Sequence, residues 1–234
     1  SDIKFGTDGW RAIIADEFTV ENVARITTAT GLWIKKNFEN NLSVVIGHDC
    51  RFAGSLFMEP AAKVLVSQGI KVYQADCIIT TPMISLAAKE LNTAIGIVLT
   101  ASHNPPEYNG FKIVHKGLPV AGEDLQRLKA IYESPDQGKA NSPGTILSMS
   151  EYHHTVIDAI VQDVGPLARR VSVAVDSANA VPGPFIVELC DKLGVDLVDL
   201  NCTWDQRSPA HPADPTRPEN MIQLSDLVAN SDCE

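Results

Sequence analysis

This 234-residue sequence lacks paired cysteines, long apolar runs and any excess of basic residues. Its five cysteines are odd in number and form no C-x-x-C pair, so neither a disulfide framework nor a zinc site is predicted. No apolar run approaches the ~20 residues that a membrane-spanning helix needs. The first residues lack the charged and apolar regions of a signal peptide, so we expect a cytoplasmic protein without a membrane partner.

The charge balance of the chain is acidic. The sequence has 19 Lys and Arg residues against 29 Asp and Glu residues, a formal net charge of −10. This excess disfavours counterion-releasing contact with nucleic acid, so no nucleic-acid partner is expected. An anionic substrate must therefore meet basic groups that are clustered locally. Hydrophobic residues at 44% and charged residues at 21% are ordinary values for a folded globular protein.

The first 134 residues alternate helical periodicity with short β-branched runs. This alternation is typical of βαβ units and of a mostly parallel sheet. Residues 94–99 form a continuous apolar run, which predicts a strand buried on both faces. Residues 135–150 are rich in Ser, Pro, Gly and Asn and show no periodicity, so they are predicted to be a linker.

Residues 151–234 repeat the same alternation and end after a predicted helix at 218–229. We therefore expect an α/β protein with a mixed, mostly parallel sheet and helices on both faces. This arrangement would be repeated as two similar α/β/α domains, 1–134 and 151–234, of which the second is incomplete. A missing strand would leave a sheet edge unpaired, which predicts possible self-association through the second domain.

The stretch T-A-S-H-N-P-P-E-Y-N-G-F-K at residues 100–112 follows the most buried strand. Open α/β sheets bind ligands at the carboxyl ends of their strands, so Ser102 is a candidate nucleophile or phosphoryl carrier. Adjacent side chains on an extended backbone point apart, so no Ser102–His103 pair is expected from adjacency alone. The alternative interpretation is a polar turn between two strands.

Two further stretches contain residues suited to anions. In F-G-T-D-G-W-R, at residues 5–11, the glycines let backbone amides approach an anion, Thr7 offers a hydroxyl and Arg11 a planar fork. The alternative is an N-terminal turn with Arg11 paired to a surface carboxylate. In G-H-D-C-R, at residues 47–51, a structural pair of Asp49 with Arg51 is the favoured interpretation.

Together, G-T-D-G-W-R, G-H-D-x-R and T-A-S-H-N-P-x-x-Y-N-G-F-K resemble the motifs of the α-D-phosphohexomutase family, in particular phosphoglucomutases and phosphomannomutases. Residues 173–183 resemble the strand and turn that open the second domain of this family. Residues 211–220 resemble the long loop before a helix of that domain. The resemblance covers essentially the whole chain but only the front of the family's four-domain architecture.

The resemblance implies that Ser102 is phosphorylated and exchanges its phosphoryl group with the 1- and 6-hydroxyls of a hexose phosphate through a bisphosphate. It implies Mg²⁺ bound through the phosphate of Ser102, and hexose 1,6-bisphosphate as activator and intermediate. Lys112 and Arg11 match residues for charge neutralisation and proton transfer. The remaining matched positions surround the phosphoserine; they are His103, assigned to catalysis, and Thr7 and Asn104, assigned to substrate binding.

The sequence departs from the family because it contains no D-G-D-x-D-R segment, which holds the metal in similar enzymes. We therefore expect negligible mutase turnover from this chain alone. The alternatives are a non-catalytic phosphosugar-binding module or a protein-interaction module. The latter is suggested by prolines at every third position from Pro209 to Pro218, the spacing of a polyproline II ligand.

Three aromatic residues of the second half have less specific patterns. His153 and His154 are adjacent on a predicted helix and so are expected on different faces, as surface residues rather than metal ligands. Trp204 lies in the long loop, where it is either a sugar platform or an anchor of the loop. We favour the anchor.

Overall fold

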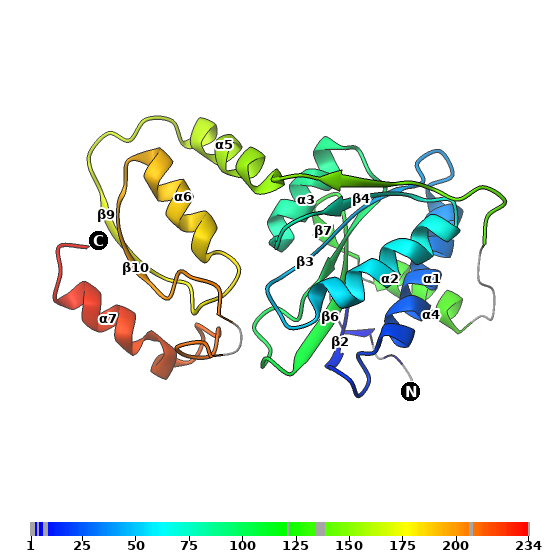
Figure 1. Ribbon diagram of the computed structural model, residues 1–234, viewed down its shortest axis with the longest axis horizontal. Helices are drawn as coiled ribbons and strands as arrows, with labels where there is room; N and C mark the ends of the chain where they lie inside the picture. The colour runs from blue at the N-terminus through cyan, green and yellow to red at the C-terminus, as the bar shows by residue number, and fades with distance from the viewer. Residues whose placement is uncertain are drawn as a thin grey trace. The chain divides into compact units, whose positions relative to one another are not determined.

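The structure is a computed structural model that describes residues 3, 5–6, 9–120, 122–133, 139–205 and 208–233. The chain divides into two compact units, and Figure 1 labels most of their helices and strands. The first unit comprises Ser1–Ala101 and Pro106–Glu151, and the second comprises Ser102–Pro105 and Tyr152–Glu234.

The first unit is built on one mixed sheet. Parallel pairing joins β3 to β4 and β5, and β4 to β8, whereas β6 pairs antiparallel with β2, β5 and the short β7. The strands are, in spatial order, β1 (Phe5–Gly6), β2 (Gly9–Ile13), β6 (Tyr108–His115), β5 (Ile95–Leu99), β3 (Ser43–His48), β4 (Lys71–Ala75) and β8 (Ile146–Met149), with β7 (Leu118–Pro119) beside β6.

Helices cover both faces of this sheet, as expected. The helices α1 (Val20–Asn37), α2 (Gly54–Ser67) and α4 (Gly122–Tyr132) enclose the main core on one face. The helix α3 (Thr81–Glu90) packs on the other, where a Cβ added to Gly96 would lie 2.6 Å from Ile84. The absence of a side chain at Gly96 therefore lets α3 approach the sheet closely.

Burial explains why the central strands form. The residues of β5 are all buried, as the continuous apolar run predicts. Next to the sheet, Phe18 is fully buried between two aromatic rings. Its ring stacks on Trp10 with centroids 4.7 Å apart and meets the edge of Phe57 at 4.8 Å. These three rings fix the start of α1 and the start of α2 against the sheet.

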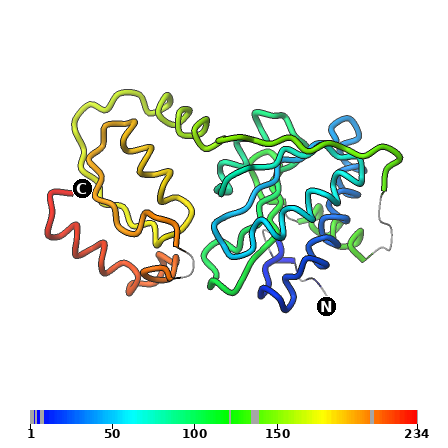
Figure 2. The backbone as a smooth tube through the Cα atoms, in the orientation of Figure 1, coloured from blue at the N-terminus to red at the C-terminus, as the bar shows by residue number. Residues whose placement is uncertain are grey.

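The segment predicted to be a linker contributes a strand to the first sheet. Residues 134–138 lie outside the described residues, but Ile146–Met149 form β8 parallel to β4, along the extended path that Figure 2 traces. Before it, Gly144 N–H donates to the carbonyl of Val66 at 2.8 Å. The sequence pattern missed β8 because three of its four side chains are exposed at a sheet edge, which leaves no alternation of buried and exposed residues.

The second unit has a smaller sheet in its described residues. Its strands β9 (Ser172–Asp176) and β10 (Asp196–Leu200) are parallel and are joined by α6 (Gly183–Leu193). The remaining elements are α5 (Tyr152–Val164), a 3-10 turn η1 (Pro218–Met221) and α7 (Ile222–Ala229). Among the described residues, no helix is long and apolar enough to cross a membrane.

Replacing Phe18 by Ala should destabilise the first unit, because the ring is fully buried, stacked on Trp10 and in edge contact with Phe57. We expect a loss of about 3–5 kcal/mol in the free energy of unfolding, measured by urea denaturation. Phe52→Ala is the matched control, because Phe52 is 74% exposed and should change stability by less than about 0.5 kcal/mol. Equal losses in both variants would contradict this account of the core.

Candidate active site

The candidate site begins where the parallel strands β3 and β5 end. These strands are in register, with His48 opposite Leu99 as the last residue of each. Asp49 therefore follows β3 at the same edge of the sheet at which Thr100 and the Ser102 loop follow β5. This is the edge at which open α/β sheets bind ligands.

Asp49 and Arg51 form a buried ion pair at this edge. Arg51 Nε lies 3.4 Å from Asp49 Oδ2, and the two side chains are only 8% and 10% exposed, respectively. The backbone N–H of Arg51 also donates to Asp49 Oδ1 at 2.9 Å. The favoured interpretation of G-H-D-C-R, a structural pair, is therefore confirmed.

The same pair holds both flanks of the Ser102 loop. On one flank, the backbone N–H of Asp49 donates to the Leu99 carbonyl at 3.1 Å, and the Thr100 side chain hydrogen-bonds to Asp49. On the other flank, Arg51 Nη1 donates to the Tyr108 carbonyl at 3.0 Å. We call this arrangement the Asp49–Arg51 clamp. The residue pattern does not reveal this clamp, because nothing in it links position 51 to position 108.

Burial dominates the electrostatics of the clamp. It raises the pKa of Asp49, against the opposing effect of the hydrogen bonds from Thr100 and the Arg51 backbone. It also lowers the pKa of Arg51, and the nearby positive charge of Arg11 acts in the same direction. Cys50 lies between these two residues in the sequence. Burial raises the pKa of its thiol to about 12, so this cysteine stays protonated and is unsuited to nucleophilic chemistry.

Arg11 and Lys112 lie on the same face of the sheet. Arg11 pairs directly with Gly110 across β2 and β6, and Lys112 is two residues further along β6. Directly opposed residues and residues two apart share a face, so the two half-buried basic side chains are diagonal neighbours. A Cβ at Gly110 would lie 2.4 Å from the Thr100 carbonyl oxygen, so glycine is required for this close packing.

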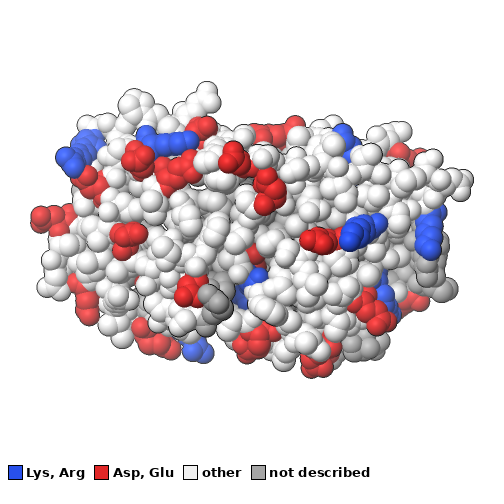
Figure 3. All heavy atoms as spheres, viewed as in Figure 1, with Lys and Arg blue, Asp and Glu red and all other residues white. Residues whose placement is uncertain are grey.

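Arg11 lies within β2, which pairs antiparallel with β1 through Gly6 and Gly9. Thr7, the predicted substrate-binding hydroxyl, lies outside the described residues. Figure 3 shows acidic side chains scattered over the face drawn, with Lys and Arg side chains at separate places among them.

Ser102 adopts a backbone conformation that the sequence pattern does not predict. Its φ angle is +57°, in the left-handed region that non-glycine residues rarely occupy, and its side chain is exposed. Ser102 Oγ lies 3.3 Å from His103 Nδ1. Adjacency alone did not predict this contact, which forms because the backbone is not extended here. Asn104 is half-buried in the same loop.

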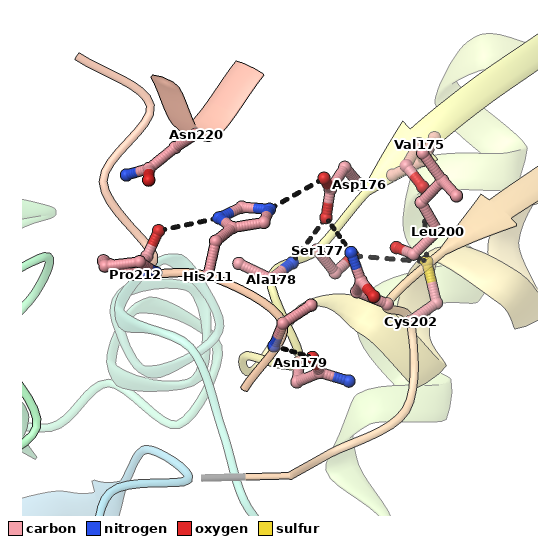
Figure 4. Close-up of polar contacts among 12 residues, drawn as sticks. Val175, Asp176, Ser177, Ala178, Asn179, Leu200, Cys202, His211, Pro212 and Asn220 are labelled. Carbon is pink, nitrogen blue, oxygen red and sulfur yellow. Dashed lines mark hydrogen bonds and ion pairs between the residues drawn. The ribbon is translucent and has the colours of Figure 1, made fainter. Parts of the chain in front are cut away.

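The second unit has its own polar cluster at the carboxyl end of β9, drawn in Figure 4. Asp176 accepts hydrogen bonds from the Ala178 N–H at 2.9 Å and from Asn201 Nδ2 at 3.1 Å. Asn179 Oδ1 accepts from the Ala210 N–H at 2.9 Å. These contacts fasten the turn after β9 to the long loop after β10.

His211 closes this cluster through both of its ring nitrogens. Its Nε2 lies 2.9 Å from Asp176 Oδ2 and its Nδ1 lies 2.9 Å from the Pro212 carbonyl oxygen. Neither partner can donate, so both contacts are hydrogen bonds together only when His211 is protonated. The hydrogen bond to Asp176 raises the pKa of His211 above its ordinary value. Burial raises the pKa of Asp176, but the hydrogen bonds from His211, Ala178 and Asn201 together lower it overall.

Trp204 acts as an anchor of the long loop. Its Nε1 donates to the Val181 carbonyl at 3.1 Å, and its ring meets the edge of Phe185 with centroids 5.8 Å apart. The favoured interpretation of Trp204 is therefore confirmed. The proline spacing that suggested a polyproline II ligand lies in this same anchored loop.

The described residues do not assemble a complete site for Mg²⁺ around the predicted ligand. Mg²⁺ requires near-octahedral oxygen coordination. At the edge beyond β3 and β5, the Asp49 carboxylate is buried and already bound to Arg51 and Thr100. Among the described residues, the Asp49 carboxylate therefore adds no metal ligand beside Ser102.

Comparison with known proteins identifies the family of the chain. Residues 2–139 match the family described as phosphoglucomutase/phosphomannomutase, alpha/beta/alpha domain I, and residues 151–234 match alpha/beta/alpha domain II. The chain therefore belongs to the phosphoglucomutase/phosphomannomutase family. The resemblance and the α/β fold predicted from the sequence are confirmed.

Individual relatives agree with this assignment. The chain is 34% identical to a phosphoglucomutase of Neisseria gonorrhoeae over 194 residues, which cover 82% of this chain and 41% of the relative. It is 32% identical to a phosphomannomutase/phosphoglucomutase of Pseudomonas aeruginosa, covering 96% of this chain and 46% of the relative. A crystal structure of a phosphoglucomutase/phosphomannomutase family protein from Burkholderia thailandensis superposes with a TM-score of 0.88 at 28% identity, covering all of this chain and 51% of that one. The chain thus spans about half the length of these relatives.

The His211–Asp176 pair should make the stability of the second unit depend on pH. The pKa of His211 is raised above 6.5, so its contribution is complete below pH 6.5 and is lost as pH rises through the raised value. We expect wild type to lose roughly 1–2 kcal/mol relative to His211→Gln across this range. The measurement is urea denaturation at several pH values. A difference between the two proteins that does not change with pH would contradict the charged pair.

Proposed function

We propose that this chain supplies the phosphoserine part of a phosphohexomutase, with Ser102 as the phosphoryl carrier. The observation that carries the proposal is the exposed Ser102 with its left-handed backbone in the T-A-S-H-N-P loop after β5. Membership of the phosphoglucomutase/phosphomannomutase family supports a hexose phosphate as the substrate.

Under this proposal Ser102 first gives its phosphoryl group to the sugar and then receives a phosphoryl group back from it. The P–O bond to Ser102 Oγ breaks while a P–O bond to a sugar hydroxyl forms. The proton of the attacking hydroxyl passes to Lys112, which must be the neutral amine at that step, and the resulting ammonium group returns the proton to Ser102 Oγ. The bisphosphate then reorients and returns its other phosphoryl group to Ser102. Such transfers depend mainly on positioning and charge neutralisation.

The basic face of the sheet fits this need for charge neutralisation. We assign the neutralisation of the transferred phosphoryl group to Arg11 together with Lys112. Arg11 presents a planar fork of donors and Lys112 a point charge, so the two can meet different phosphate oxygens. We assign His103 to catalysis beside Ser102 and Asn104 to substrate binding.

The proposed cofactors are Mg²⁺ and hexose 1,6-bisphosphate. Mg²⁺ bound through the phosphate of Ser102 would neutralise charge on the transferred group. The sequence contains no D-G-D-x-D-R segment to complete that site. We therefore propose that the 234 residues alone turn over hexose phosphate negligibly.

Transfer of labelled phosphoryl from a hexose 1,6-bisphosphate in the presence of Mg²⁺ tests the proposal. Label should appear on Ser102 of the protein and disappear in Ser102→Ala. Ser148→Ala is the matched control, because Ser148 is an exposed serine on β8 and its loss should leave labelling unchanged. The labelled peptide is identified by mass spectrometry, and the experiment is repeated on any longer reading frame that contains the chain.

If neither the 234-residue chain nor the longer protein is labelled although both are well folded, the phosphoserine assignment is overturned. If that protein still bound a hexose phosphate, the non-catalytic phosphosugar-binding alternative would replace it. Label that persists in Ser102→Ala would assign the phosphoryl carrier to another residue.

A further inference from the structure

Two neighbouring histidines of the second unit converge with a glutamate from another helix. His153 and His154 lie in the first turn of α5, and Glu188 lies in α6. The two imidazole rings have centroids 3.9 Å apart and are tilted by 41°. The sequence-based expectation that adjacent positions would send these rings to different faces is therefore wrong.

The donor atoms of these three side chains are close enough to share one ion. One ligand atom from each lies within 4.8 Å of the other two. His154 Nδ1 and Glu188 Oε1 are 2.7 Å apart and are joined by a hydrogen bond. Zinc bonds of about 2.0–2.1 Å in tetrahedral geometry place two ligand atoms about 3.3 Å apart. To bind an ion, His154 and Glu188 would therefore have to move slightly apart, with loss of the bridging proton, and any pair as wide as 4.8 Å would have to close.

Packing already orders this cluster in the absence of an ion. The ring of His153 lies against Phe185 of α6, with centroids 5.3 Å apart, and Phe185 is 7% exposed. The side chain of His154 remains 43% exposed and that of Glu188 26% exposed. The site is thus held by the packing of α5 on α6 and remains open to an ion from solvent.

The local charge favours a divalent cation but includes one competitor. Lys192 Nζ lies 3.1 Å from Glu188 Oε1 and 2.6 Å from Asp158 Oδ1. Two carboxylates therefore surround one ammonium group, which leaves a net negative charge when the histidines are neutral. Lys192 occupies the same Glu188 oxygen that would coordinate an ion, so the ammonium group competes with metal binding.

We propose that His153, His154 and Glu188 form a binding site for a borderline divalent cation, Zn²⁺ or Co²⁺, that joins α5 to α6. Two imidazole nitrogens and one carboxylate oxygen are ligands suited to these ions, whereas Mg²⁺ prefers oxygen ligands alone. The fourth position is open to water or to another small ligand. This site is separate from the Mg²⁺ predicted at Ser102 and does not rest on the proposed mutase activity.

Titration of the purified chain with Co²⁺ tests this proposal, because tetrahedral Co²⁺ with nitrogen ligands absorbs visible light. We expect saturable absorption with a stoichiometry of one ion, displaced by Zn²⁺ and unaffected by excess Mg²⁺. His154→Ala and Glu188→Gln should each weaken binding on the order of tenfold or more. Asp199→Asn is the control, because Asp199 is an exposed carboxylate on β10 outside the cluster.

Lys192→Met provides a second test, in which the expected change is tighter binding and so cannot result from misfolding. Removing the competing ammonium group should tighten Co²⁺ binding several-fold, and bound Zn²⁺ should raise the melting temperature of this variant more than that of wild type. The proposal is overturned if no Co²⁺ binds. It is equally overturned if His154→Ala and Glu188→Gln bind as wild type does, or if Lys192→Met binds more weakly.

Discussion

The ion pair of Asp49 with Arg51 is the contact on which the candidate active site depends. Both side chains are nearly inaccessible to solvent, so neither charge could be tolerated there without the other. The pair also bonds to Thr100 on one side of the Ser102 loop and to Tyr108 on the other. A buried charge at the end of β3 thereby fixes where the loop leaves the sheet and where it returns.

The parts of the fold with strong sequence signals were predictable. The continuous apolar run of β5 indicates burial on both faces, and all five residues of this strand are buried. Thr19 is of a residue type that favours helix N-caps, and it caps α1 by accepting from the Asn22 N–H at 3.2 Å. The family motifs identified the Ser102 loop because their spacing is specific. In each case the signal lies in consecutive residues, which is where sequence patterns are informative.

The features that the sequence did not predict depend on tertiary contacts. The left-handed φ of Ser102 comes from a loop fixed at both ends rather than from a residue that favours this conformation. The strand β8 is stabilised by pairing with β4 at an exposed edge, so its own side chains carry little pattern. His153 and His154 are brought together by α6, which begins about thirty positions later in the chain.

Hydrogen exchange of residues 100–108 in Arg51→Lys tests the central claim most directly. Lysine keeps the charge beside Asp49 but cannot reproduce the guanidinium fork that also reaches the Tyr108 carbonyl. The account predicts faster exchange in this loop, unchanged exchange in β9 of the second unit, and no effect of Arg127→Lys, whose parent side chain is 59% exposed. Wild-type exchange rates in the loop of a folded Arg51→Lys variant would contradict the claim that the pair holds the Ser102 loop.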